Sequence, residues 1–219
     1  MENKNKALVV FSAGQDSTTC LAWAINKFGE GNVEAITFDY NQRHSVEIEQ
    51  AKIITQKHNI PHFIHKVGVL GWNKNALTDN SVDIKQTKTV PTSFVPYRNV
   101  HFLLIAATYA RSRGINNLVT GVCQTDFSGY KDCRDVFIKS FEVMINQADD
   151  YQIIIHTPLM WLDKSEEVLM MQELGKLEWL ADSHTCYEGK RPACGECPAC
   201  KLRLKGFKDA NIEDPTVYE

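Results

Sequence analysis

The sequence predicts an α/β fold in which a mostly parallel sheet carries helices on both faces. Short apolar runs alternate along the chain with segments whose apolar residues recur every three or four positions. Such alternation is typical of βαβ units, which pair parallel strands. After about residue 180 the composition shifts to Cys, Gly and Pro. We therefore expect an α/β domain over residues 1–180 and a small metal-binding C-terminal region over residues 181–219.

Five strands are expected, at residues 7–11, 33–38, 62–67, 118–122 and 152–155. The first helix follows residue 17, because apolar residues from Leu21 to Phe28 recur with helical spacing. A second helix is expected to begin at Ser45 as its cap and to end before Pro61. These elements place the loops after the first two strands at the edge of the sheet where ligands bind.

Three further helices complete the expected pattern. One helix begins near residue 98 and ends at Gly114, and another covers the apolar residues from Phe137 to Met144. A capping box between Asp163 and Glu166 predicts the start of the last one. Residues 68–97 are polar and contain two prolines, which predicts a long functional or mobile loop.

Composition narrows the class of protein. The chain has 219 residues, 43% of them hydrophobic, and a net charge of −3, so it lacks the basic character that nucleic-acid binding requires. Since no apolar run reaches about 18 residues, no membrane span is expected. The first six residues are polar, and the apolar run after them is too short for a signal peptide. We therefore expect a cytoplasmic protein, whose seven cysteines more often bind metal or act in catalysis than form disulfides.

The loop at residues 12–17, between the first strand and the first helix, is a candidate phosphate site. A helix N-terminus offers unpaired N–H groups and partial positive charge, and small residues let the backbone approach an anion. Ser12 and Ser17 add hydroxyl donors, and Asp16 could hold Mg²⁺. The alternative is an ordinary turn in which Asp16 or Ser17 only caps the helix.

This loop is not a Walker A motif, but it resembles the PP-loop of ATP pyrophosphatases, Ser-Gly-Gly-x-Asp-Ser. Ala13 departs from that pattern. Alanine is unfavourable there if the backbone needs a positive φ and harmless if it does not.

Four cysteines, Cys186, Cys194, Cys197 and Cys200, lie within fifteen residues and form two overlapping C-x-x-C steps. Four thiolates complete a closed tetrahedral shell, so the pattern favours structural zinc. An iron–sulfur cluster, a disulfide and a redox-active pair are the alternatives. His184 could replace one ligand, although an isolated histidine is usually a surface residue.

Taken together, the chain resembles the 7-cyano-7-deazaguanine synthase (QueC) family from about residue 7 to residue 218. The resemblance rests on residues 11–19 (FSAGQDSTT), 37–44 (TFDYNQRH), 94–99 (FVPYRN), 120–134 (TGVCQTDFSGYKDCR) and 157–164 (TPLMWLDK), followed by the cysteines. Ala13, Asn41, Tyr97 and Lys131 depart from the Gly, Gly, Gly and Pro that are more typical of this family.

The resemblance implies a Rossmann-like (adenine-nucleotide-α-hydrolase-like) fold and a reaction of queuosine biosynthesis. In that reaction ATP adenylates 7-carboxy-7-deazaguanine, ammonia displaces AMP to give an amide, and a second activation dehydrates the amide to the nitrile. ATP with Mg²⁺, structural Zn²⁺ and a homodimer are implied as well. Adenylation answers a chemical need, because a carboxylate is a poor electrophile and AMP is a good leaving group.

The resemblance also suggests roles for individual residues. The expected ATP-binding residues are Ser12, Ala13, Gly14, Gln15, Asp16, Ser17 and Thr18. The expected catalytic residues are Asp16, Lys164 and Arg98. Lys164 could instead be a solvated lysine, and Arg98 with Asn99 could only cap a helix and carry surface charge.

The deazaguanine ring is expected at residues 126–132, where Asp126 or Asp132 would accept its two adjacent N–H donors. The full set of expected substrate-binding residues is Asp126, Phe127, Ser128, Tyr130, Asp132, Arg134, Gln42 and Arg43. The aspartates could instead cap turns around Gly129.

Two other functions remain open at this point. One is a PP-loop enzyme that thiolates tRNA and holds an iron–sulfur cluster, although the acidic net charge argues against it. The other is a zinc-held binding module without enzymatic activity.

Overall fold

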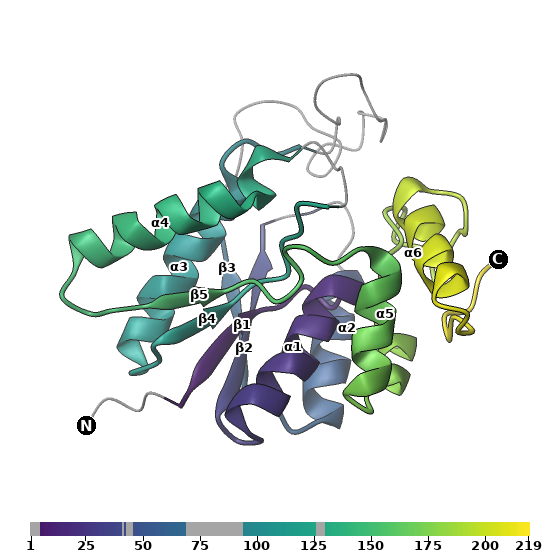
Figure 1. Cartoon of the computed structure of the whole chain (residues 1–219), viewed down its shortest axis with the longest axis horizontal. Helices are drawn as coiled ribbons and strands as arrows, with labels where there is room; N and C mark the ends of the chain where they lie inside the picture. The colour runs from purple at the N-terminus through teal and green to yellow at the C-terminus, as the bar shows by residue number, and fades with distance from the viewer. Residues whose placement is uncertain (1–4, 41, 43–45, 69–93, 126–129) are drawn as a thin grey trace.

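A computed structural model of the chain describes residues 5–40, 42, 46–68, 94–125 and 130–219. Within these residues five parallel strands form one sheet in the order β3-β2-β1-β4-β5 (Figure 1). The strands are β1 (Ala7–Val10), β2 (Val33–Asp39), β3 (His62–Lys66), β4 (Asn117–Val119) and β5 (Ile154–His156). The strand order changes direction between β1 and β4, which is where open parallel sheets bind ligands.

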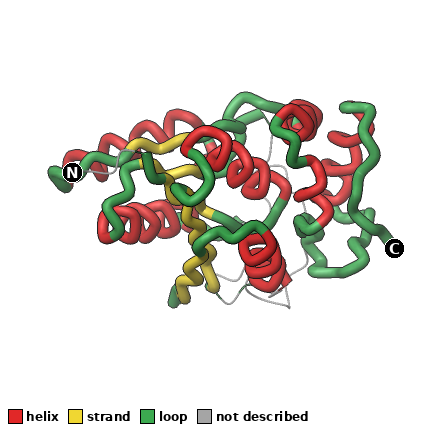
Figure 2. Tube along the Cα trace, turned by 90° about the horizontal axis from the view of Figure 1, so that it is seen from below, coloured by secondary structure: helices red, strands yellow, loops and turns green. Residues whose placement is uncertain are grey.

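Helices cover both faces of the sheet, as Figure 2 shows from below. The cluster of buried residues on one face joins α1 (Gln15–Phe28), α2 (Val46–Lys57) and α5 (Lys164–Glu173) to Val9 of β1. The cluster on the other face joins α3 (Arg98–Ser112) and α4 (Asp135–Ala148) to Leu8 of the same strand. Neighbouring residues of a strand point to opposite faces, so β1 is buried on both sides. The predicted α/β fold is confirmed.

Most of the expected element boundaries are correct within a few residues. The Asp163–Glu166 capping box is present, and Gly114 follows α3 with φ +67°. The strand expected at residues 118–122 is shorter, because the ladder with β1 ends at Val119 and residues 120–123 line a cavity. The strand expected at 152–155 is shifted to β5. Ser45 and most of the loop expected at 68–97 lie outside the described residues.

A short 3-10 helix, η2 (Leu177–Ala181), leads into the C-terminal region, whose α6 (Pro198–Asp209) packs against α5 (Figure 1). Arg203 of α6 is fully buried, and its guanidinium pairs with Asp214 at 2.9 Å and donates to Ser183 Oγ at 2.6 Å. Phe207 of α6 joins the buried cluster of α1 and α5. The C-terminal region is thus attached to the α/β body by both apolar and polar contacts. No helix in the described part of the chain has the length and apolar character that crossing a membrane would require.

Candidate functional site

A cavity of about 380 Å³ lies beyond the carboxyl ends of β1, β2 and β4. Three parts of the chain contribute to its wall. Residues of the sheet side include Ser12, Gly14, Gln15, Asp16, Ser17, Tyr40, Gln42, Thr120 and Gly121. The starts of helices contribute Glu47, Arg98, Asn99 and Lys164. The C-terminal region contributes His184, Thr185, Tyr187, Ala199, Leu202 and Arg203.

The loop between β1 and α1 is shaped by its own serines. Ser17 Oγ accepts a hydrogen bond from Ser12 N at 3.2 Å and donates to Gly14 O at 3.2 Å. Gly14 is the N-cap residue of α1, and among the described residues no side chain caps this helix. The alternative of a simple cap by Asp16 or Ser17 is therefore not observed. The first-turn N–H groups and the helix dipole are left for an anion.

Ala13 adopts φ +62°, in the left-handed region that favours glycine. Its side chain is fully buried, and its carbonyl accepts a hydrogen bond from His184 N at 2.8 Å. Thr18 is also fully buried and does not line the cavity. Of the residues expected to bind ATP, Ala13 and Thr18 therefore lie behind the cavity surface.

Lys164 joins the first turn of α1 to α5. Its ammonium lies 2.9 Å from Asp16 Oδ1 and 2.7 Å from Glu167 Oε1, and only 8% of the residue is exposed. Glu167 is fully buried, whereas Asp16 lines the cavity. A solvated lysine does not fit this arrangement. A buried cation paired with two carboxylates is held firmly in place at the cavity wall.

Two glycines allow this close packing. A Cβ on Gly121 would lie 3.1 Å from the backbone carbon of Asp16, so the loop after β4 can approach α1 only without a side chain there. A Cβ on Gly206 of α6 would lie 2.6 Å from Cβ of Lys164. The C-terminal region therefore rests directly on the backbone that carries Lys164.

Arg98, at the first position of α3, is part of a polar cluster on the cavity wall. It donates to the hydroxyl of Tyr40, and it interacts electrostatically with Glu47 and Asp132. Burial raises the pKa of Tyr40, and it raises the pKa of Glu47 to about 7 although the Arg98 cation opposes the shift. The alternative that Arg98 carries only surface charge does not fit its place in the cavity wall.

The residues expected to bind the substrate ring are only partly described. Arg43, Asp126, Phe127 and Ser128 lie outside the described residues. Tyr130 and Gln42 line the cavity, and Gln42 accepts from Tyr40 N at 3.0 Å.

The remaining two expected substrate contacts follow Tyr130. Asp132 is half-buried in a short 3-10 helix, η1 (Lys131–Cys133), and its carbonyl accepts from the Asn99 side chain at 3.3 Å. Burial raises the pKa of the Asp132 carboxyl, and the Arg98 cation opposes this shift. Arg134 is exposed at the N-cap of α4, outside the cavity wall.

The four clustered cysteines converge as expected. Their sulfur atoms all lie within 4.8 Å of one another, and the sulfurs of Cys194 and Cys200 are 3.9 Å apart. Metal–sulfur bonds of about 2.3 Å in a tetrahedron place two sulfurs about 3.8 Å apart, so the four thiols fit one ion. His184 is not part of this group. It is buried, and its ring nitrogen Nε2 lies 3.1 Å from Cys186 O.

Comparison with known proteins identifies the family of this chain. The family model described as "Queuosine biosynthesis protein QueC" matches residues 6–211. The chain belongs to the QueC family. Relatives named 7-cyano-7-deazaguanine synthase are 53% identical in Clostridium acetobutylicum (94% of this chain and 94% of the relative) and 48% identical in Chromobacterium violaceum (97% and 93%). Among solved structures, a 4-thiouridine synthetase in complex with RNA and ATP is similar at 21% identity with a TM-score of 0.49, covering 94% of this chain and 51% of that one.

Several wall residues of this QueC-family chain were not expected from sequence. Glu47 lies in the first turn of a helix, where an acidic residue is ordinary because of the helix dipole. His184, Tyr187 and Arg203 belong to the C-terminal region, and nothing local in the sequence shows that this region reaches the cavity. The spacing of the cysteines was the only signal that this region folds into a defined unit.

Proposed function

We propose that the chain is an ATP-dependent 7-cyano-7-deazaguanine synthase that converts 7-carboxy-7-deazaguanine and ammonia to the nitrile through adenylated intermediates. The observation that carries the proposal is the match to relatives of that name along nearly the whole chain. The cavity supports it, because an uncapped helix N-terminus and a buried lysine meet there. The alternatives of a tRNA-thiolating enzyme and of a binding module without activity are disfavoured by the same match.

The residues of the cavity suit adenylation of a carboxylate. In the proposal, the backbone at residues 12–17 and the N-terminus of α1 bind the pyrophosphate part of ATP. Lys164 stabilises negative charge that develops on the phosphates, and its two carboxylate partners fix its position. Arg98 faces the same cavity and would orient the substrate carboxylate toward the α-phosphate.

Asp16 is the residue that we expect to hold Mg²⁺. Its carboxylate lines the cavity at the first turn of α1, and magnesium is bound through one or two carboxylates together with substrate phosphates. When bound, this ion would neutralise charge on the transferring phosphate oxygens.

The cysteine cluster is proposed to hold one Zn²⁺ in a structural role. Four sulfurs leave no open position for water or substrate, so the ion would supply folding free energy rather than chemistry. An iron–sulfur cluster remains the rival for the same four thiols, and elemental analysis separates the two.

The substrate side of the proposal rests on Tyr130, Gln42 and the neighbouring stretch. Tyr130 lines the cavity and could stack on the deazaguanine ring, with Asp132 two residues further along the chain. Recognition of the base edge by Asp126 or Asp132 stays a prediction. A homodimer likewise remains a prediction from the resemblance, and a cytoplasmic location a prediction from the composition of the chain.

The test is incubation with ATP, Mg²⁺, ammonia and 7-carboxy-7-deazaguanine, followed by mass spectrometry and nucleotide chromatography. We expect the nitrile, together with AMP and pyrophosphate. Asp16→Ala should lose turnover by about 100-fold or more while remaining folded, because it removes both the Lys164 partner and the proposed Mg²⁺ ligand. Asp209→Ala, in an exposed pair with Lys205, is the control and should keep parental turnover. Formation of ADP without AMP would rule adenylation out.

A further inference from the structure

Glu47 is a carboxyl group of the cavity that none of the steps above uses. It lies in the first turn of α2, it is half-buried, and it lines the cavity together with Arg98, Tyr40 and the loop at residues 12–17. The next acidic residue of α2, Glu49, is exposed and pairs with Lys52 at 2.7 Å. The chain thus places one carboxyl in the cavity and a second, two residues further along the same helix, in solvent.

We propose that Glu47 binds ammonium in the cavity and removes a proton from it, so that ammonia can attack the acyl adenylate. The inference rests on the proposed function and assigns the nitrogen donor a place on the cavity wall. The reaction needs a neutral amine with a free lone pair. Ammonium, like the lysine side chain, keeps its proton at neutral pH in water.

The surroundings of Glu47 suit both parts of this task. A carboxylate is the side chain that attracts a small cation, and this one lines the cavity in which the acyl adenylate is proposed to form. Burial raises the pKa of Glu47 to about 7, which brings its basicity close to the working pH of a cytosolic enzyme.

The charged neighbours of Glu47 favour proton transfer from a bound ammonium to Glu47 over binding of ammonium without proton transfer. In the described part of the chain, the charged or titratable groups that interact with it are Arg98 of α3 and Tyr40 after β2. The Arg98 cation disfavours a second positive charge beside it, so an ammonium held by Glu47 is made more acidic. Tyr40 is held neutral by its raised pKa and adds no competing charge.

The protons and electrons of the step balance. Ammonium gives one proton to the Glu47 carboxylate and becomes ammonia. The nitrogen lone pair forms the C–N bond at the carbonyl carbon, and the C–O bond to the phosphate breaks, so that AMP leaves with that electron pair. The second proton lost by nitrogen passes to the leaving phosphate, whose second pKa is about 6. Glu47 then returns its proton to solvent.

The two halves of the reaction provide a selective test. Only the conversion of acid to amide consumes ammonia, whereas conversion of amide to nitrile consumes ATP alone. Glu47→Gln keeps the shape of the side chain and removes its basicity. We expect about 100-fold slower formation of amide from the acid, with a raised KM for ammonium, and a near-parental rate when the amide is supplied. Glu49→Gln, the matched control on the same helix, should change neither rate.

Two results would overturn the assignment. If Glu47→Gln slows both halves equally, Glu47 supports the fold or the ring rather than ammonia. If it slows neither half, the nitrogen donor is handled elsewhere. Failure of the proposed function itself looks different, because the parent enzyme would then give no nitrile from either the acid or the amide.

Discussion

Two parts of the cavity wall, the sheet wall and the C-terminal wall, are held in place by different forces. The sheet wall consists of the residues that follow β1, β2 and β4, and those strands are buried on both faces, as fully buried Leu8 and Val9 show. The C-terminal wall consists of residues 184–203. Its own buried cluster is small and contains three of the four cysteines, Cys186, Cys197 and Cys200, with Ala193 and Ala199. Hydrophobic burial thus positions the first wall, while the second contains the four-cysteine cluster and a buried Arg203–Asp214 pair.

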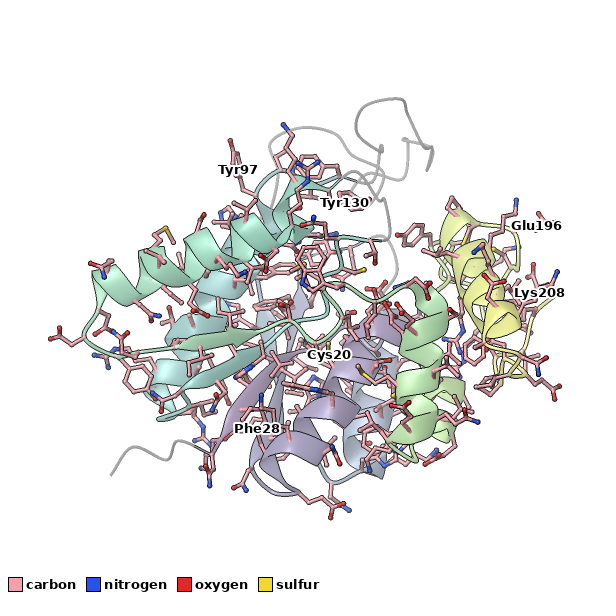
Figure 3. The ribbon with its side chains drawn as sticks, in the orientation of Figure 1. Cys20, Phe28, Tyr97, Tyr130, Glu196 and Lys208 are labelled. Carbon is pink, nitrogen blue, oxygen red and sulfur yellow. The ribbon has the colours of Figure 1, made fainter. Side chains whose placement is uncertain are left out.

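The difference matters because the C-terminal region contacts two segments of the candidate site, the loop at residues 12–17 and the start of α5. His184 N donates to the carbonyl of Ala13 in the phosphate loop at 2.8 Å. Gly206 of α6 lies against the backbone of Lys164. Substitutions in the C-terminal wall should therefore alter nucleotide binding at the proposed site. This should hold although the outer surface of the C-terminal region, where Figure 3 labels Glu196 and Lys208, lies at the edge of the molecule.

The largest expected effect comes from removing one thiol. Cys197→Ser takes away one thiol of the cluster but keeps a side-chain acceptor for Cys200 N at the start of α6, because serine is a good N-cap residue. Metal content should fall from about one ion per chain to nearly none, and amide hydrogen exchange should increase over residues 183–219. The amides of β1 and β4 should stay protected, because their burial does not depend on the metal. ATP affinity should also fall, as the contacts to Ala13 and Lys164 loosen.

Glu196→Gln is the control for this comparison. Glu196 is exposed between two of the ligands and offers no thiolate, so metal content and exchange should match the parent. Retention of a stoichiometric ion in Cys197→Ser, with unchanged exchange, would show that the C-terminal wall does not depend on the four-thiolate site.

A smaller effect is expected where the walls meet. Alanine in place of Gly206 would normally favour a helix by about 1 kcal/mol, but its Cβ would lie only 2.8 Å from Lys164 O and 2.6 Å from Lys164 Cβ. The two helices must separate, so Gly206→Ala should lower the free energy of unfolding by about 1–3 kcal/mol. Because Lys164 moves with α5, the KM for ATP should rise. Urea unfolding and steady-state kinetics measure the two effects.

Lys205→Ala serves as the neighbouring control on α6. Lys205 is exposed and pairs with Asp209 one turn away, so the free energy of unfolding should change by less than about 0.5 kcal/mol. A Gly206→Ala variant that is more stable than the parent would mean that helix propensity outweighs the close contact, and that α5 and α6 can shift relative to each other at little cost.

The sequence predicted the sheet wall better than the C-terminal wall. Alternating strands and helices with a small-residue loop are local patterns, so the fold, the loop at residues 12–17 and the capping box of α5 were all predictable. The contacts of Gly206, His184 and Arg203 join residues far apart in the chain. A glycine within a helix or a lone histidine has no pattern that reveals such a partner. Glu47 was missed for another reason, since acidic residues are common in the first turn of any helix.

The smallest expected effect concerns two residues with the same backbone conformation. Ala13 and Tyr97 both adopt φ +62°, and both stand where the family resemblance expects glycine. A left-handed conformation costs an L-residue about 1–2 kcal/mol, and glycine avoids this cost. Glycine also makes the unfolded chain more flexible, which lowers the free energy of unfolding by about 0.4–1 kcal/mol. Tyr97 is 70% exposed and points away from the molecule in Figure 3, so its side chain contributes little packing. Tyr97→Gly should therefore stabilise the protein by about 0.5–1 kcal/mol.

Ala13→Gly should stabilise the protein less than Tyr97→Gly does, because Ala13 is fully buried where the loop meets the C-terminal region. Losing its methyl group costs about 0.8 kcal/mol of burial, which offsets most of the strain that glycine relieves. Urea unfolding of both variants gives the difference directly. Asn59→Gly is the control, since asparagine tolerates its φ of +53° and should gain nothing from the change. If Ala13→Gly proved the more stabilising of the two variants, the backbone strain at Ala13 would exceed the free energy that burial of its methyl group contributes.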